Sequence, residues 1–228
     1  MNVLLIRPGE TEFDRSERVQ GTLNLPLTDL GRSQLRDLAE QLISSPRLWH
    51  GVPEIYCAPT EPAPESAKIL AKALSLKVRV LEDLVNLHHG LWQGKFVQEI
   101  ESRQSRVFRQ WEEAPESVRP PEGETCGEVI ARARKALRKA LKRGVDFILV
   151  APDPLAALVA CDLANVPLRV PSLSRRIASG TENDEDAERV TTVATMELVR
   201  IPIVQRPGPP LPVANELLIN TPRFLTLR

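Results

Sequence analysis

Charged side chains follow two short apolar runs of the chain. Arg7 comes directly after the first run, with Gly9 and Glu10 behind it, and Asp153 follows the second run at 147–150. An apolar run that ends in turn residues predicts a buried strand, and open α/β sheets bind ligands at the carboxyl ends of their strands. We therefore expect Arg7, Gly9, Glu10 and Asp153 to line one ligand pocket.

These residue types allow more than one role. Asp153 could act as a nucleophile or general base, and His88 or His89 could supply acid–base catalysis in the same cleft. Alternatively, Asp153 is a residue of a turn or helix start, and both histidines are surface residues of a loop. Arg7 could bind an anion weakly, or it could be the structural ion-pair partner of Glu10 or Asp153. The residues alone leave these alternatives open.

The composition of the 228-residue chain excludes several classes of partner. Thirty basic and thirty acidic residues cancel, so no net field favours nucleic acid or an anionic membrane. The first apolar run is too short for a signal peptide or a membrane span. Three widely spaced cysteines, Cys57, Cys126 and Cys161, predict reduced thiols in a cytoplasmic protein rather than a disulfide framework or a zinc site. We expect no metal and no cofactor.

Periodicity and turn residues predict an α/β protein. The length suits one domain, which we expect at 1–205, followed by a Pro-rich extended tail at 206–228. An acidic surface loop is expected at 181–189, and irregular loops at 13–28 and 115–123. The predicted strands cover 4–6, 55–56, 78–81, 147–150 and 191–203, and the predicted helices cover 29–45, 65–76, 97–113, 124–143 and 155–163.

Six short motifs follow one another between Leu4 and about Leu163. They read Arg7-x-Gly9-Glu10-Thr11, Gln20-Gly21, Pro26-Leu27-Thr28-x-x-Gly31, Tyr56-x-x-Pro59 with Ala63 and Ser66-Ala67, Gly90-Leu91-Trp92-Gln93-Gly94, and Pro121-Glu122-Gly123-Glu124-Thr125. In this order they resemble the histidine phosphatase superfamily, whose members share the phosphoglycerate-mutase-like fold. The resemblance implies a three-layer α/β/α architecture with a mostly parallel central sheet.

The same resemblance shows where the chain departs from the chemistry of that family. The family uses a histidine nucleophile, a second histidine and two arginines around the phosphate, and an acid for the leaving oxygen. Arg7 matches the first arginine. The positions of the other groups hold Pro8 for the nucleophile, Pro62 for the second arginine, Asn86 for the acid and Pro152 for the second histidine.

From these replacements we expect a pseudophosphatase, a catalytically inactive chain that keeps the fold as a binding or regulatory scaffold. Its partner would be an unidentified protein or small-molecule ligand, and homodimer formation is left open. The alternative is a phosphoesterase or phosphomutase-like enzyme with altered chemistry based on Asp153, His88 and His89, or a weak anion sensor based on Arg7. We also expect a salt bridge between Arg7 and Asp153 if the two side chains approach each other.

Overall fold

A five-stranded sheet forms the centre of the protein in the computed structural model, which describes residues 1–46, 49, 51–167 and 196–200. Its strands are β1 (Asn2–Ile6), β2 (Glu54–Cys57), β3 (Lys77–Val80), β4 (Phe147–Val150) and β5 (Met196–Arg200). They lie in the order β3-β2-β4-β1-β5. Only β5 runs antiparallel to its neighbour, and the other described pairs are parallel. The predicted, mostly parallel sheet is therefore confirmed.

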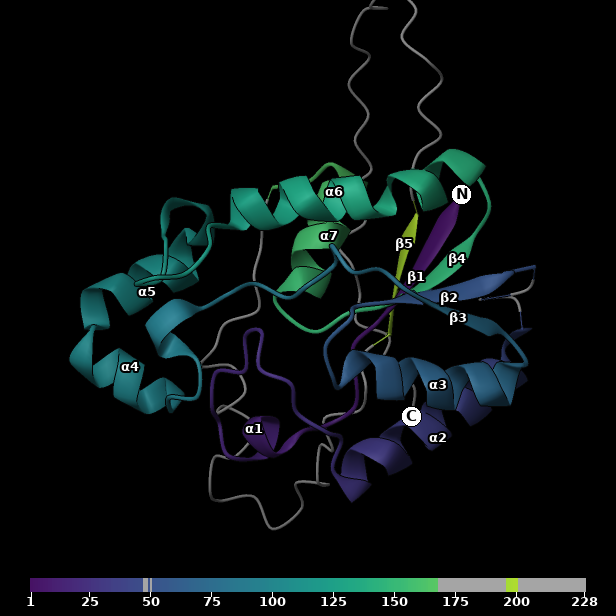
Figure 1. The fold of residues 1–228 in the computed structure, drawn as a ribbon, viewed down its shortest axis with the longest axis horizontal. Helices are drawn as coiled ribbons and strands as arrows, with labels where there is room; N and C mark the ends of the chain where they lie inside the picture. The colour runs from purple at the N-terminus through teal and green to yellow at the C-terminus, as the bar shows by residue number, and fades with distance from the viewer. Residues whose placement is uncertain (47–48, 50, 168–195, 201–228) are drawn as a thin grey trace, which may run out of the picture.

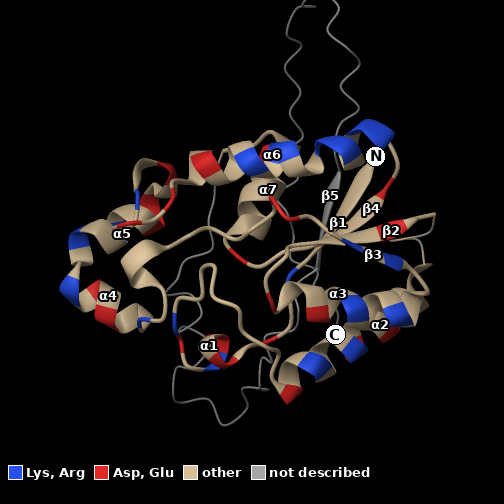
Figure 2. Cartoon of the chain, viewed as in Figure 1, with Lys and Arg blue, Asp and Glu red and all other residues tan. Residues whose placement is uncertain are grey.

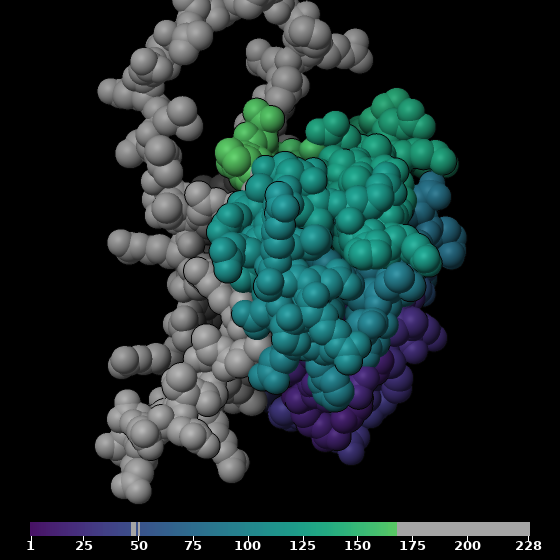
Figure 3. Space-filling model, turned by 90° about the vertical axis from the view of Figure 1, so that its left-hand side faces the viewer, coloured from purple at the N-terminus to yellow at the C-terminus, as the bar shows by residue number. Residues whose placement is uncertain are grey.

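Helices cover both faces of this sheet, which confirms the predicted three-layer α/β/α architecture (Figure 1). Helices α2 (Asp29–Ser44) and α3 (Ala63–Leu74) lie on one face, and α6 (Cys126–Arg143) and α7 (Leu155–Ala164) lie on the other. The remaining described helices are α1 (Glu12–Arg15), α4 (Val97–Arg103), α5 (Ser105–Glu113), η2 (Gly90–Trp92) and η3 (Pro115–Ser117). Residues of α4 and α5 form the end of the molecule that faces the viewer in Figure 3.

The central strands are apolar because they are covered on both sides. All four residues of β4 are buried, and so are the last four of β1. Parallel strands buried on both faces read as continuous hydrophobic runs rather than alternating ones. The continuous apolar runs of β1 and β4 therefore identify both segments as strands by sequence alone.

The predicted single helix at 97–113 is wrong, because the chain breaks into α4 and α5 at Gln104. The backbone N–H of Gln104 closes α4 on the carbonyl of Ile100 at 2.8 Å. Its side-chain oxygen accepts a hydrogen bond of 3.0 Å from the indole N–H of Trp92, which is fully buried. Buried indole N–H groups usually find a hydrogen-bond partner, and Gln104 at the break is the partner of Trp92.

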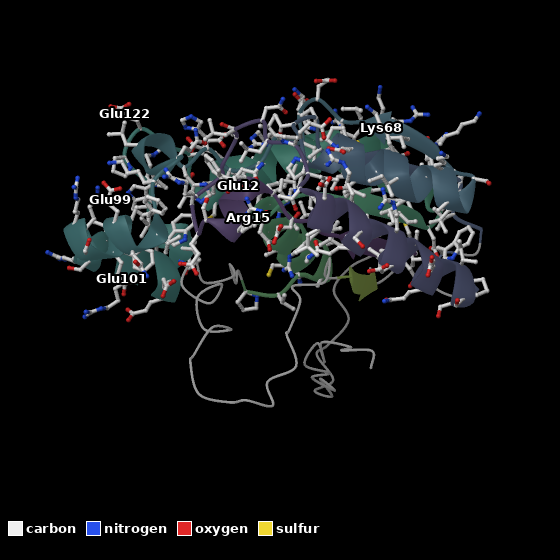
Figure 4. All side chains as sticks on the ribbon, turned by 90° about the horizontal axis from the view of Figure 1, so that it is seen from below. Glu12, Arg15, Lys68, Glu99, Glu101 and Glu122 are labelled. Atoms are coloured by element: carbon white, nitrogen blue, oxygen red, sulfur yellow. The ribbon has the colours of Figure 1, made fainter. Side chains whose placement is uncertain are left out.

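The predicted irregular loop at 13–28 is also partly wrong, because its first residues belong to the short helix α1. Thr11 caps α1 in a reciprocal arrangement with Asp14, whose carboxylate accepts from the Thr11 N–H and hydroxyl. Glu12 and Arg15 form an ion pair of 2.5 Å on the exposed side of this turn (Figure 4). The capping box is a local signal that the broader irregular pattern obscured.

Helix α6 begins and ends with the charges that suit its dipole. Thr125 caps the first turn, and the Glu128 carboxylate accepts a hydrogen bond from the Thr125 N–H. Lys142 and Arg143 lie in the last turn. Figure 2 shows acidic residues at the start of α6 and basic residues along the rest of it. This order stabilises both ends of a helix dipole, so the helix boundaries follow from local sequence.

Replacing Glu128 by glutamine should remove a stabilisation that depends on pH. Hydrogen bonds from the Thr125 backbone and from Arg119 lower the pKa of Glu128 from 4.5 to about 2. A lowered folded-state pKa gives stability that is present above pH 4.5 and is lost as the pH falls toward about 2. We therefore expect wild type and Glu128→Gln to differ in unfolding free energy at about pH 7 and to converge at low pH, as measured by urea unfolding.

A suitable control is Glu101→Gln on α4. The Glu101 side chain points away from the molecule in Figure 4 and forms no ion pair within the described part of the chain. A pH dependence in Glu101→Gln as large as that in Glu128→Gln would show that the effect is general charge rather than the cap.

Some expectations concern residues that the structure does not describe. The acidic loop at 181–189, the tail at 206–228 and the domain boundary at 205 all lie outside the described residues. The predicted strand at 191–203 is described only at β5, which pairs with β1. Within the described ranges, no helix is long and apolar enough to cross a membrane.

Candidate active site

The side chains of Arg7 and Asp153 meet at the carboxyl edge of the sheet. Strands β1 and β4 are parallel neighbours with Ile6 opposite Val150, so the residues that follow them emerge at the same edge. Arg7 Nε lies 2.5 Å from Asp153 Oδ2, and the two side chains keep 25% and 12% of their surface exposed. This contact confirms the predicted ion pair.

Hydrogen bonding at this ion pair is incomplete. The contact from Arg7 Nε is close but not aligned as a hydrogen bond, and Asp153 Oδ1 is buried without a hydrogen-bond partner among the described residues. Buried polar atoms in folded proteins are almost always paired with protein or water. Asp153 Oδ1 is therefore held in the ion pair without a protein donor among the described residues.

Asn86 lies next to this pair and is fully buried. Its Nδ2 donates to the carbonyl oxygens of Gly21 at 3.1 Å and Asp153 at 2.9 Å. Its Oδ1 accepts from the backbone N–H of Leu155 at 3.2 Å. Both ends of the amide are thus engaged by the backbone, and a carboxamide is in any case too weak an acid to protonate a leaving group.

The three prolines that the resemblance assigns to the family's catalytic positions lie near the same edge of the sheet. Pro8 follows Arg7, and Pro152 is buried between β4 and Asp153. Pro62 is buried at the start of α3, where it precedes the first helical turn. None of these rings can attack phosphorus, bind an anion through charge or donate a backbone N–H. Their positions in the site are therefore chemically silent.

Gly9 and Glu10 lie beside the edge, but their contacts lead away from Arg7. The Gly9 N–H donates to Ser66 Oγ at 3.3 Å. The Glu10 carboxylate accepts a hydrogen bond of 2.7 Å from the Thr28 hydroxyl, and its backbone N–H donates to Gln34. Of the four residues predicted for the pocket, the structure thus joins Arg7 to Asp153 and uses Glu10 to hold the start of α2.

His88 and His89 are held by elements other than β1 and β4. The backbone of His88 exchanges two hydrogen bonds with Glu124 at the start of α6. The ring of His89 packs edge-on against Trp111 of α5 with centroids 5.6 Å apart. His89 is only 2% exposed, so the interpretation of this histidine as a surface residue is wrong. Packing against α5 buries it, which a loop sequence alone could not reveal.

Two residues with roles near the site were not identified as functional candidates. Ser66 Oγ accepts the Gly9 N–H and donates to the carbonyl of Pro62 at 2.7 Å, so it ties the Arg7 turn to α3. Arg132 of α6 donates to the carbonyl of Asn86 at 2.9 Å. Its sequence context was a run of basic residues typical of a solvated helix face. Arg132 pairs with Glu124, which precedes the capping Thr125 of α6, and no local pattern in the sequence signalled this pair.

Cys57, at the end of β2, does not offer an alternative nucleophile. The side chain is fully buried, and burial raises the pKa of the Cys57 thiol to about 11. A thiol with such a pKa is almost entirely protonated at neutral pH, and the thiolate is the reactive form. Among the described residues, no group of three or more His, Cys, Asp or Glu side chains could hold a metal ion.

The fold and the site motifs place the chain in a known class of proteins. The family model of the histidine phosphatase superfamily (branch 1) matches residues 3–177, and the chain belongs to that family. It is 29% identical to phosphoserine phosphatase 1 of Hydrogenobacter thermophilus over 171 residues. This stretch covers 74% of this chain and 78% of that protein. It is 30% identical over 179 residues to the probable phosphoglycerate mutase GpmB of Yersinia enterocolitica, covering 78% of this chain and 80% of that protein.

A solved structure agrees with this assignment. The mycobacterial glucosyl-3-phosphoglycerate phosphatase, determined with VO3, superposes with a TM-score of 0.66 over 86% of this chain and 90% of that one. At 23% identity, this likeness concerns the fold.

The comparisons also correct one expectation. Relatives similar in sequence are named as a phosphatase and a probable phosphoglycerate mutase, and this finding contradicts the expectation of a pseudophosphatase that is not an enzyme. The replacements that the resemblance implies concern the particular groups that the family uses. They do not remove the cation and the carboxylate that remain at the edge of the sheet.

Proposed function

We propose that this chain is a phosphoesterase or phosphomutase-like enzyme whose chemistry is altered from that of its family and depends on Arg7 and Asp153. The observation that carries the proposal is the Arg7–Asp153 pair at the carboxyl edge of the sheet, where open α/β folds place their ligands. Family membership and the names of the similar proteins support a phosphate ester as the substrate.

Arg7 is the group that would bind the phosphate. A guanidinium presents several N–H donors in one plane, a geometry that matches two oxygens of a phosphate. In the structure its charge is balanced by Asp153, so an incoming dianion must compete with that carboxylate. We therefore expect weak substrate binding, with a KM well above that of an enzyme with two arginines in the site.

Asp153 is the group that would act on the phosphorus. As a nucleophile, one of its carboxylate oxygens would form a bond to phosphorus while the bond to the ester oxygen breaks, and water would then hydrolyse the acyl phosphate to inorganic phosphate. As a general base, it would take a proton from a water whose oxygen attacks the phosphorus directly. Both routes use the Asp153 carboxylate, whose side chain keeps 12% of its surface exposed.

The leaving oxygen has no built-in acid in this arrangement. Asn86 stands at the position of the family's acid, and its amide hydrogens are committed to Gly21 and Asp153. The leaving oxygen would then take its proton from water. An aryloxide leaves without prior protonation more easily than an alkoxide does, so we expect aryl phosphates to be faster substrates than alkyl phosphates.

The three cysteines remain the basis for proposing a cytoplasmic location.

Hydrolysis of p-nitrophenyl phosphate and of a panel of alkyl phosphates tests the proposal, with wild type beside Arg7→Ala. Loss of one preorganised donor to a transition state costs about 10²–10³-fold in turnover, and we expect Arg7→Ala to lose at least that. Arg134→Ala, which breaks an ion pair with Asp162 near the end of α7, serves as the matched control. Wild-type turnover that survives in Arg7→Ala, or no turnover at high enzyme concentration, would contradict the proposal.

A further inference from the structure

We infer that Asn86 is a positioning residue that sets the Asp153 carboxylate against Arg7, in place of the acid that the family carries there. The inference concerns the place of Asp153 in the structure. Its catalytic meaning rests on the function proposed above. The contacts of one buried amide, of the turn around Asp153 and of one arginine on α6 carry it.

The Asn86 amide joins three segments of the chain that are far apart in sequence. It donates to Gly21 in the loop after α1, donates to the carbonyl of Asp153, and accepts from Leu155 at the start of α7. The bonds to Asp153 and Leu155 hold the backbone on both sides of Pro154. An amide is suited to this because it offers two donors at one end and an acceptor at the other.

The turn around Asp153 depends on an outside donor. Pro152 and Pro154 have no backbone N–H, so neither can donate hydrogen bonds within the turn. In the first turns of α7, the backbone N–H of Ala156 donates to the Pro152 carbonyl at 2.9 Å, and that of Leu158 donates to the Pro154 carbonyl at 3.0 Å. The Asp153 carbonyl accepts its hydrogen bond from the Asn86 side chain. A carboxylate at position 86 would instead place its lone pairs against the Gly21 and Asp153 carbonyls.

Asn86 is itself fixed from α6. The guanidinium of Arg132 donates to the carbonyls of Asp83, Val85 and Asn86, and it pairs with the carboxylate of Glu124 at 3.0 Å. Burial opposes ionisation of Glu124, but hydrogen bonds from Arg132 and the His88 backbone outweigh it and lower its pKa. One connected set of bonds therefore runs from α6 through Asn86 to the backbone of Asp153, whose side chain reaches Arg7.

Asn86→Asp separates positioning from proton donation because it keeps the volume and one acceptor but removes both N–H donors. If Asn86 positions Asp153, kcat should fall by about 10²-fold on aryl and alkyl phosphates alike with little change in KM, as expected for a catalytic group displaced by about 1 Å. A gain on alkyl phosphates would overturn the inference, because position 86 would then reach the leaving oxygen. Gln104→Glu, which keeps its acceptor for Trp92, is the matched control.

A second measurement does not depend on activity. Urea unfolding of wild type, Arg7→Gln, Asp153→Asn and the double variant forms a double-mutant cycle. The cycle gives the coupling free energy between Arg7 and Asp153. We expect the same cycle in an Asn86→Ser background to show less than about half of that coupling. If the Asn86→Ser chain does not fold, Arg132→Lys must lower the coupling instead, because lysine cannot hold three carbonyls and a carboxylate in one plane.

Coupling that is unchanged in both backgrounds would overturn the positioning role. The two proposals also fail separately. Loss of coupling in a chain without phosphoesterase activity would support positioning and reject the proposed function. Unchanged coupling in an active chain would do the opposite.

Discussion

Replacing Asp153 by asparagine is expected to lower the turnover of aryl phosphates by at least about 10²-fold. Asparagine keeps the size of the side chain but has neither the charge nor the basicity that both proposed routes need. Acid–base catalysis by one side chain contributes about 10²–10⁴-fold, whereas loss of a nucleophile that works within a unit costs about 10⁶-fold. The size of the loss therefore separates a base from a nucleophile at position 153.

Trapping gives a second, qualitative answer. If Asp153 attacks phosphorus, wild type that is quenched during turnover of a labelled aryl phosphate should retain label that hydroxylamine releases, as an acyl phosphate does. Asp153→Asn should retain none. If Asp153 is a general base, neither protein should be labelled although wild type still turns over.

The matched control for this experiment is Asp162→Asn. Asp162 of α7 pairs with Arg134 at 2.5 Å, so the change neutralises a carboxylate in an ion pair of the same length near the other end of the helix. We expect its turnover to equal that of wild type. Equal losses in Asp153→Asn and Asp162→Asn would mean that the effect comes from α7 as a whole, and the role of Asp153 would be rejected.

The second large effect is expected for Gly9→Ala, which should destabilise the fold by about 1–3 kcal/mol and also reduce turnover. A Cβ on Gly9 would lie 2.4 Å from the carbonyl oxygen of Gly31, and one on Gly31 would lie 2.3 Å from that of Glu10. Both contacts are with backbone atoms, which cannot rotate away as a side chain can. The turn that carries Arg7 must therefore shift from the start of α2.

Gly127→Ala is the control, and it should change stability in the opposite direction. Gly127 is exposed in the first turn of α6, and a Cβ there would meet only Thr125 Oγ1, at 4.0 Å. Alanine is favoured over glycine inside a helix by about 0.8–1 kcal/mol. Chemical unfolding of the three proteins measures both effects. Equal stability of Gly9→Ala and wild type would show that the two backbones separate without cost.

Local features of the chain were predictable because their causes lie within a few residues. The apolar runs of β1 and β4, and the capping threonines Thr28 and Thr125, are read from neighbouring positions in the sequence. The break at Gln104 was not predictable in this way. It depends on the indole of Trp92, which belongs to another element.

The features of the candidate site likewise fall into those that the sequence predicts and those that need the structure. The sequence by itself, through its ordered motifs, determined the family, the layered fold and the surviving Arg7. It left open whether Arg7 meets Asp153, and the structure shows that contact. Only the tertiary structure decided that Asn86 is saturated by three backbone groups and that Arg132 holds the loop beneath it. These bonds join residues that are 46 to 69 positions apart, and no local pattern encodes a partner at such a distance.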